Sequence, residues 1–376
     1  MGDAVYGPAR LLPLEICTHN GISGEHNQLF ANICGMFAAE RFLFFCSWLT
    51  GLLVNLGRRP LRKTPGRILV IRRDELGDMV TTLPVFELFK KYYPQAELTV
   101  FCKPQMAQLI KEHPCIDVIA TDWKQLQGHY DYLADLRGDW KSLRYALRQW
   151  SHRVDRGSHR FLNRLFKREQ GHEVDLNIRI ITPLLPEKPE PIAPRLYPNR
   201  RQQQQAELFL QRNDIGQFVV FHTGARKLLR RWALQKWAEL AVFLYQRYEL
   251  QVIFVGGDED VADIEKIRKR LPFHTHCFVG EGDLLSYAAL AGRARLMVGN
   301  ESGPMHMAAA MGVPVIALFG PGQPEIFAPY GAGNRYLHVK LSCNPCDQVH
   351  CVHPKNPCIN RIEVQDVLRE AATLLG

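Results

Sequence analysis

Short runs of β-branched and aromatic residues alternate with longer amphipathic stretches over most of this chain. From Arg67 onward these runs predict strands at residues 67–73, 97–102, 116–120, 131–136, 218–222, 251–257, 277–280, 295–299 and 314–320. Hydrophobic spacing between them predicts helices, among others at residues 80–93, 104–113, 233–248, 259–270, 283–291 and 303–312. Strands that alternate with helices form parallel sheets, because a parallel pair needs a crossover connection. The sequence therefore predicts an α/β fold.

Residues 181–205 divide this pattern into two halves. Six prolines are followed there by a run of glutamines, a composition typical of an extended linker. We expect a doubly wound domain on each side, residues 67–180 and 206–362, and a final helix, 363–376, that crosses back towards the first half. Open α/β sheets bind ligands beyond the carboxyl ends of their strands. Two such domains facing each other place a ligand-binding cleft between them.

Residues 1–66 precede this pattern and are expected to form an apolar, helical extension. The start of the chain lacks the basic and apolar regions of an export signal. Residues 42–57 carry no charge, but this run is shorter than the ~20 residues that cross a bilayer. Four basic residues follow closely, so the segment either anchors at an anionic membrane surface or packs as a helical pair on the protein body.

The charge balance favours an anionic partner. The 376 residues include 47 Lys and Arg against 38 Asp and Glu, which gives a formal net charge of +9. Such an excess attracts nucleic acid, acidic lipid or a phosphorylated or carboxylated substrate, and it is equally typical of a solvated basic surface.

A Gly-Asp turn follows the first predicted strand. Gly77 permits a tight turn, after which Asp78 lies at the carboxyl end of the strand and at the start of a helix. A carboxylate in this position faces the cleft and is able to act as a general base towards a hydroxyl group. The alternative is that Asp78 only caps the helix.

The second domain carries a candidate phosphate site. In residues 299–321 a strand ends in a turn of small residues and a helix begins at Gly303 or Pro304. Backbone N–H groups of Ser302, Gly303 and the residues after them then point at a shared anion, which suits a pyrophosphate. His306 lies one turn into the helix and either contacts a phosphate or packs.

Two further loops end strands at the same predicted edge. The loop after residues 218–222 is basic and contains Arg226, Lys227, Arg230 and Arg231. Cations there neutralise a departing nucleotide diphosphate in place of a divalent metal. The loop after residues 251–257 contains Asp258 and Glu259, and carboxylates in that position accept hydrogen bonds from ribose hydroxyls.

Together these residues resemble the ADP-heptose:lipopolysaccharide heptosyltransferases, a family of inverting bacterial glycosyltransferases with the GT-B fold (family nine). The resemblance covers about residues 67–375, and its most specific parts are residues 68–99 and 300–321. It implies two Rossmann-like domains that face each other across a cleft. It further implies that the first domain binds the acceptor and the second binds the nucleotide sugar.

The resemblance also assigns roles to individual residues. It implies that Asp78 is the general base, and that the donor's phosphates lie against Asn300, Glu301, Ser302, Gly303 and His306. Glu301 replaces the family's usual Asp. The basic residue that precedes the family's Trp-Pro pair falls on Arg230, or on Arg231 with a one-residue shift, and Ala233 replaces the Pro.

The function that the resemblance implies is transfer of a heptose from ADP-heptose to an acidic glycolipid, the lipopolysaccharide inner core. We expect inversion at the sugar, no catalytic metal or other cofactor, no nucleic-acid partner and a cytoplasmic location with peripheral contact to the inner membrane. Alternatives are another nucleotide sugar, a protein acceptor, a nucleotide-sugar epimerase, or a non-enzymatic protein that binds anions.

A basic segment lies in the first half of the chain. Residues 141–168 hold nine Lys and Arg against a single acid, Asp155. Arginines at residues 153, 156, 160 and 164 recur at helical spacing and predict one helix with a basic face. We expect phosphates or carboxylates of the acceptor to bind Arg144, Arg148 and Arg153. A membrane contact and a solvated face are the alternatives.

Four cysteines lie close together near the end of the second half. Cys343, Cys346, Cys351 and Cys358 fall within 16 residues, a spacing that matches a tetrahedral zinc or iron site. Four thiolates leave no open coordination position, so a metal there is expected to be structural. Reduced or partly disulfide-linked thiols are the alternative.

Overall fold

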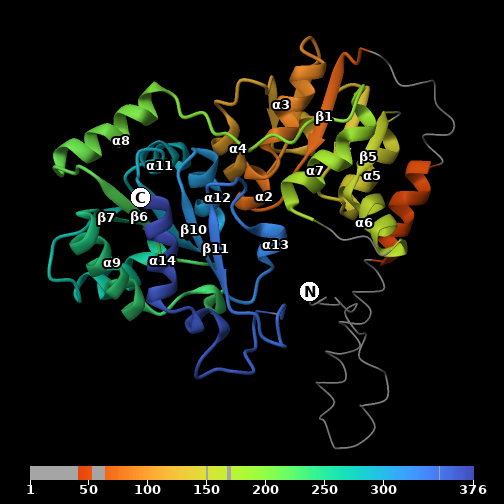
Figure 1. Cartoon of the computed structure of the whole chain (residues 1–376). Helices are drawn as coiled ribbons and strands as arrows, with labels where there is room; N and C mark the ends of the chain where they lie inside the picture. Colours follow the sequence, from red (N-terminus) through yellow and green to blue (C-terminus); the bar gives the residue numbers. More distant parts are fainter. Residues whose placement is uncertain (1–40, 53–63, 150, 167–170, 347) are drawn as a thin grey trace, which may run out of the picture.

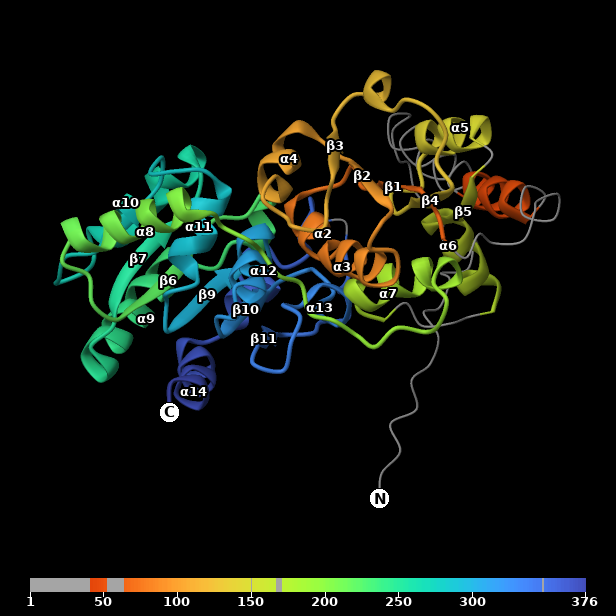
Figure 2. The ribbon, with the colours of Figure 1, turned by 90° about the horizontal axis from the view of Figure 1, so that it is seen from above.

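The computed structural model describes residues 41–52, 64–149, 151–166, 171–346 and 348–376. Its core is two separate parallel sheets with helices packed on their faces (Figures 1 and 2). The first sheet has the strand order β3-β2-β1-β4-β5 and the second the order β11-β10-β9-β6-β7-β8. These two doubly wound halves confirm the predicted α/β fold.

The first sheet is built around its central strand. β1 (Arg67–Ile71) pairs in parallel with β2 (Glu97–Phe101) and β4 (Tyr132–Asp135), while β3 (Val118–Ala120) and β5 (His152–Asp155) form the edges. The last four residues of β1 are fully buried because helices cover both faces of the sheet. The first domain's helices are α2 (Leu76–Val80), α3 (Leu83–Tyr92), α4 (Pro104–Ile110), α5 (Trp140–Arg148), α6 (Arg156–Leu165) and α7 (Glu173–Ile181).

The second sheet follows the same plan. Its strands are β6 (Phe218–His222), β7 (Gln251–Val255), β8 (His276–Phe278), β9 (Leu296–Asn300), β10 (Val315–Phe319) and β11 (Arg335–His338). All residues of β6, β9 and β10 are buried. The helices of this domain are α8 (Arg200–Arg212), α9 (Leu234–Tyr248), α10 (Val261–Arg268), α11 (Leu284–Ala291), α12 (Gly303–Ala310), α13 (Pro324–Phe327) and α14 (Val364–Leu375).

The expected extended linker is only partly extended. Residues 181–184 complete α7 and a 3₁₀ turn, and the glutamine run lies inside α8. Asn199 caps α8 by accepting a hydrogen bond from the backbone N–H of Gln202, whose side chain accepts one in return. Glutamine has a high helix propensity, so a capped glutamine run continues as a helix. Residues 185–199 remain the irregular connection.

The predicted crossing of the last helix is wrong. α14 contacts α9 and strands β9, β10 and β11, all in the second domain (Figure 2). Val364, Val367 and Ala371 bury its apolar stripe in the core of that domain. The stripe matches the face of the sheet beside α9, which leaves the helix no apolar surface for the first domain.

Part of the N-terminal extension packs on the first domain. Residues 41–52 form a helix beside α5 and α6, and Leu43 and Phe44 cluster with Leu143 of α5. For these residues the packing interpretation is confirmed, while residues 1–40 and 53–63 lie outside the described ranges. Within those ranges, none of the helices combines the length and the apolar character that a bilayer crossing requires.

The basic segment is not one helix. It folds as α5, strand β5 and α6, so Arg153 lies on a strand, while Arg156, Arg160 and Arg164 lie on α6, where Arg156 is buried and the other two are exposed. Arg153 lies on β5, is 6% exposed and pairs with Asp155 at 3.2 Å. Its predicted contact with an acceptor is therefore wrong. Arg144 and Arg148 are exposed on α5.

Arg156, at the start of α6, is 4% exposed. Its guanidinium donates to the carbonyl of Leu136 at 2.7 Å, to Asn177 at 2.7 Å and to both carboxylate oxygens of Glu173. Four acceptor atoms on three residues surround this buried cation, which makes it part of the framework of the domain.

We expect Arg156→Ala to lower the free energy of unfolding by about 3–5 kcal/mol, because it leaves Glu173 buried with one partner fewer. Arg144→Ala, at an exposed position of the same segment, is the matched control and is expected to stay within about 0.5 kcal/mol of the parent. Urea unfolding measures both. Equal stability of the two variants would contradict a framework role for Arg156.

Candidate active site

A cavity of about 980 Å³ lies between the two domains. The first domain lines it with Glu75 and the first turn of α2, and the second domain lines it with loops that follow β6, β7, β8 and β9. These are the carboxyl ends of parallel strands, as the sequence predicts. The charged residues along the wall are Glu75, Asp78, Arg226, Arg230, Arg231, Glu259, Asp260, Asp283 and Glu301.

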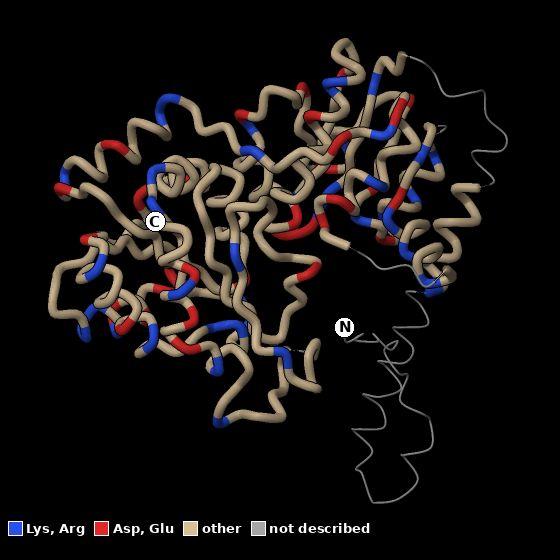
Figure 3. The backbone as a smooth tube through the Cα atoms, in the orientation of Figure 1, with Lys and Arg blue, Asp and Glu red and all other residues tan. Residues whose placement is uncertain are grey.

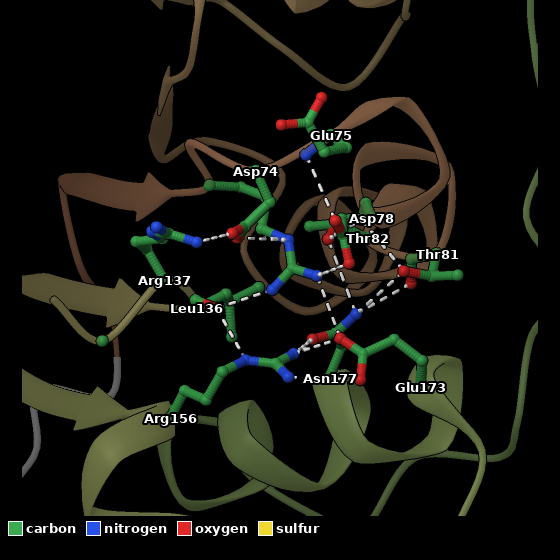
Figure 4. Close-up of polar contacts among 12 residues, drawn as sticks. Asp74, Glu75, Asp78, Thr81, Thr82, Leu136, Arg137, Arg156, Glu173 and Asn177 are labelled. Carbon is green, nitrogen blue, oxygen red and sulfur yellow. Dashed lines mark hydrogen bonds and ion pairs between the residues drawn. The ribbon is translucent and has the colours of Figure 1, made fainter. Parts of the chain in front are cut away.

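Asp78 lines this cavity from the first turn of α2 (Figure 4). One carboxylate oxygen accepts a hydrogen bond from the backbone N–H of Glu75 at 3.1 Å, and the other accepts from Arg72 at 3.0 Å. The side chain remains 27% exposed. The sequence left two alternatives for Asp78, a helix cap or a residue that faces the cleft. In the structure the same carboxylate does both.

Burial raises the pKa of Asp78 above its usual value. Arg72 opposes that rise, while the nearby carboxylates of Asp74 and Glu173 add to it. A raised pKa makes a carboxylate a better proton acceptor, because basicity increases with the pKa of the conjugate acid.

Arg72 is buried behind Asp78 and holds its carboxylate in position. Its side chain is 2% exposed, and it donates to the Leu136 carbonyl at 2.6 Å and to Glu173 at 2.9 Å. Glu173 in turn is held by Arg156. Although burial opposes it, the two arginines keep the pKa of Glu173 below its usual value. The charge beside Asp78 is therefore locked in place by a buried network.

The two domains meet directly beside this turn. α2 packs against α12 of the second domain. A Cβ atom on Gly77 would lie 3.0 Å from the ring of His306, and one on Gly303 would lie 2.6 Å from the side chain of Leu76. The close approach needs glycine on both sides, so the predicted turn glycine also serves the contact between domains.

The small-residue loop lies where the sequence places it. Ser302, Gly303 and His306 line the cavity from the N-terminal end of α12. Asn300 does not line it. Asn300 is fully buried, donates to the carbonyl of Thr223 at 2.7 Å and accepts from the backbone N–H of Trp232 at 3.2 Å. It joins the loop after β9 to the loop after β6, which holds both in place.

His306 packs at the contact between the domains. It is 7% exposed, and burial lowers its pKa to about 4, with His172 lowering it further. The ring is therefore neutral at physiological pH and offers a phosphate no positive charge.

Arg230 and Glu301 form an ion pair on the cavity wall. Their closest atoms are 3.1 Å apart, and Arg230 also donates to Gln348 at 2.6 Å. The side chain of Glu301 is 6% exposed, and its Oε2 has no hydrogen-bond partner among the described residues. Burial raises the pKa of Glu301 to about 7, against the opposing effect of Arg230. The predicted donor residues thus include a carboxylate that titrates near neutral pH.

Arg231 also lines the cavity, but it already has acidic partners. It lies 3.3 Å from both Asp260 and Asp263 and donates to the carbonyl of Ala225 at 2.8 Å. Of the two carboxylates predicted for the ribose, Glu259 lines the cavity and Asp258 does not.

Arg226, one of the cations predicted in the basic loop, lines the cavity. Its side chain is 74% exposed, and it reaches across the cleft to Glu75 of the first domain at 3.2 Å. Glu75 also pairs with Lys103 at 2.9 Å. The basic loop was the available signal, but its contact with the other domain depends on how the two sheets face each other.

The predicted acceptor residues Arg144 and Arg148 do not line the cavity. They lie on the outer side of the first domain, exposed on α5.

The four cysteines gather around one small cavity of about 30 Å³, next to Leu229 of the basic loop. All four carry free thiols. Within the described part of the chain, however, no three His, Cys, Asp or Glu side chains come close enough to hold a metal ion. The thiols as placed do not fit a metal.

Comparison with known proteins identifies the family. Residues 119–356, more than half of the chain, match the model of glycosyltransferase family 9 (heptosyltransferase). The chain belongs to this family. It is therefore a glycosyltransferase.

Individual relatives agree with this assignment. The family-9 chain is 25% identical to lipopolysaccharide heptosyltransferase 3 of Escherichia coli over 68% of its own length and 83% of that protein's length. A family 9 glycosyltransferase from Veillonella parvula superposes with a TM-score of 0.71 at 22% identity, covering 82% of this chain and 97% of that chain. The E. coli heptosyltransferase WaaC with ADP gives 0.61 at 18% identity, covering 82% and 99%. The two-sheet architecture is the GT-B fold.

The buried Glu301 of this glycosyltransferase predicts a pH-dependent stability. Its folded-state pKa of about 7 exceeds the ordinary value of 4.5, so protonation favours the folded state. That stabilisation is complete below about pH 4.5 and is lost as the pH rises through 7, on the order of 3 kcal/mol in total.

We expect Glu301→Gln to remove most of this dependence, because glutamine stays neutral. The difference in unfolding free energy between the parent and the variant, measured by urea unfolding from pH 5 to pH 8, is the readout. A difference that does not change across this range would contradict the raised pKa.

Proposed function

We propose that this glycosyltransferase transfers a heptose from ADP-heptose to an acidic glycolipid of the lipopolysaccharide inner core, with inversion and without a catalytic metal. The observation that carries the proposal is one cavity with a basic carboxylate on the first domain and a helix N-terminus with arginines on the second. The first-domain wall suits the acceptor, and the second-domain wall suits the nucleotide-sugar donor. Two of the relatives named above are heptosyltransferases, and one of these was solved with ADP.

The donor's diphosphate fits the second-domain wall. Backbone N–H groups at the start of α12 are unpaired within the helix and point at the cavity, which favours an anion there. Arg230 and Arg226 line the same wall. Charge-assisted hydrogen bonds from these groups stabilise the negative charge that develops as the nucleotide diphosphate leaves. Cationic side chains thus supply what a divalent metal supplies elsewhere.

Asp78 fits the role of general base. A neutral sugar hydroxyl attacks the anomeric carbon, the bond from that carbon to the diphosphate oxygen breaks on the opposite face, and the proton of the hydroxyl passes to Asp78. The backbone N–H of Glu75 and the guanidinium of Arg72 fix the orientation of the carboxylate. Burial supports the chemistry, because it raises the pKa of Asp78.

A transfer assay tests the proposal. ADP release from ADP-heptose, measured with truncated lipopolysaccharide acceptors in the presence of EDTA, is expected to match the rate without EDTA. Asp78→Asn is expected to lower turnover by about 10²–10⁴-fold while ADP affinity and melting temperature hold nearly steady. Glu75→Gln, a carboxylate lost from the same turn, is the control and should cost far less.

Two results would contradict these roles. Loss of activity in EDTA would show that the reaction needs a metal. An Asp78→Asn enzyme that keeps more than about a tenth of parent turnover but melts at lower temperature would reduce Asp78 to a helix cap.

Donor binding is expected to depend on Arg230. Removing it costs about 1.5–3 kcal/mol of ADP affinity, the usual contribution of a hydrogen bond to a charged group. Because Arg230→Ala also leaves Glu301 without its cation, the variant is best made together with Glu301→Gln and compared with Glu301→Gln alone. Lys227→Ala, in the same loop but outside the cavity wall, is the matched control. Calorimetry with ADP measures the difference, and equal affinities would remove Arg230 from the donor site.

A further inference from the structure

The outer side of the first domain carries a face that is both apolar and basic. We define this docking face by the exposed residues of the helix over residues 41–52, of α5 and of the end of α6. It exposes large apolar side chains that a water-facing surface normally keeps inside, namely Phe42, Phe45, Leu52, Trp140, Leu147 and Leu165. Exposed basic residues accompany them, namely Arg41, Lys141, Arg144, Arg148 and Arg164.

The helix over residues 41–52 is apolar on two sides. Leu43, Phe44 and Ser47 are buried and face α5 and α6. Phe42, Phe45 and Leu52 recur at helical spacing on another side and are 61%, 39% and 43% exposed. Phe42 contacts Trp140 of α5 and Phe45 contacts Phe161 of α6, with ring centroids 6.2 and 5.7 Å apart. Both rings nevertheless stay exposed, so packing on the domain covers this second side only in part.

α5 continues this face. Trp140, Arg144, Leu147 and Arg148 recur three or four residues apart, so they share the side of the helix that faces away from the sheet. Trp140 is 48% and Leu147 49% exposed. The ring of Trp140 lies 6.2 Å from that of Phe42, which joins the two helices into one surface.

The charge of the face has a single sign. Among the described residues, none of Lys141, Arg144, Arg148 and Arg164 forms an ion pair. Asp155, the acid within residues 141–168, is buried and pairs with Arg153, and Asp139, directly before α5, pairs with Arg137. Figure 3 shows basic positions recurring along α5 and α6. Unpaired cations interleaved with exposed aromatic and aliphatic side chains match an anionic lipid surface, where apolar groups enter the interface and cations meet headgroup phosphates.

The face also begins beside the active site. Trp140 opens α5 directly after Asp139, which pairs with Arg137 at 3.4 Å. Arg137 forms an ion pair with Asp74, and Asp74 lies 3.3 Å from Arg72, the partner of Asp78. A bilayer in contact with this face therefore lies next to the first-domain wall of the cleft.

We propose that this face docks the enzyme on a bilayer that carries anionic phospholipids. The docking is inferred from the residues of this face alone. Only its use in reaching a lipid-borne acceptor rests on the proposed function. In this docking, Arg144 and Arg148 bind lipid headgroups rather than an acceptor in the cavity.

Vesicle sedimentation of the full chain, without donor or acceptor, tests the docking. Binding is expected to vesicles of phosphatidylcholine and phosphatidylglycerol in equal parts, to weaken as salt is raised, and to be much weaker for phosphatidylcholine alone. Arg144→Glu with Arg148→Glu, and separately Trp140→Ser with Leu147→Ser, are expected to lower partitioning into the anionic vesicles by more than about tenfold. Arg201→Glu with Leu208→Ser, exposed on α8 of the second domain, is the matched control and should bind like the parent.

The opposing outcomes are distinct. Unchanged binding by the α5 variants, or equal binding to neutral and anionic vesicles, overturns the proposal. If the parent self-associates in sedimentation velocity, does not bind vesicles and becomes monomeric in the variants, the face joins two copies of this chain instead. If the variants bind no less but melt at lower temperature, the face packs within the chain. A result against ADP-heptose as donor leaves the vesicle assay untouched, so the two proposals fail independently.

Discussion

The buried carboxylate of Glu173 is the interaction on which the first half of the active site depends. It lies between two buried arginines, Arg72 from the end of β1 and Arg156 from the start of α6. Both arginines also donate to the carbonyl of Leu136, which follows β4. One anion and two cations thereby tie together two strand ends and two helices. Because desolvated charges are costly unless every partner is in place, the network fixes a single geometry for Asp78.

The second constraint is the close approach of the two domains. α2 and α12 contact each other through Gly77 and Gly303, positions where a side chain would collide with His306 or Leu76. The proposed base and the proposed phosphate site therefore lie at adjacent helix starts on opposite walls. The proposed inverting transfer needs an acceptor group and a leaving group on opposite faces of one carbon, and this contact would set their separation.

Much of this arrangement could be predicted from the sequence, because parallel strands and their carboxyl-end loops leave local signals. Strand β6 and the turn at Asp78 follow from hydrophobic spacing and a Gly-Asp pair. The role of Asn300 could not be predicted, because its partners lie about 70–80 residues away and a motif does not tell a loop clamp from a ligand contact. The same holds for Arg153, where helical spacing continued through a strand. Residue spacing alone does not predict burial, because burial depends on where in the sheet a residue lies.

Three groups of arginines have different roles in this molecule, and the groups differ in their exposure to solvent. Arg72 and Arg156 are buried and paired, so they hold the framework. Arg144 and Arg148 are exposed on α5, where only solvent or a partner meets them. Arg230 lies between these cases, partly exposed and paired with a carboxylate whose pKa is raised to about 7. A diphosphate that approaches Arg230 competes with Glu301 for the guanidinium, and a protonated Glu301 competes less. The second-domain wall, proposed above to bind the donor, would thus link the charge of a bound diphosphate to a proton on Glu301, a coupling that an Arg with no acidic neighbour does not have.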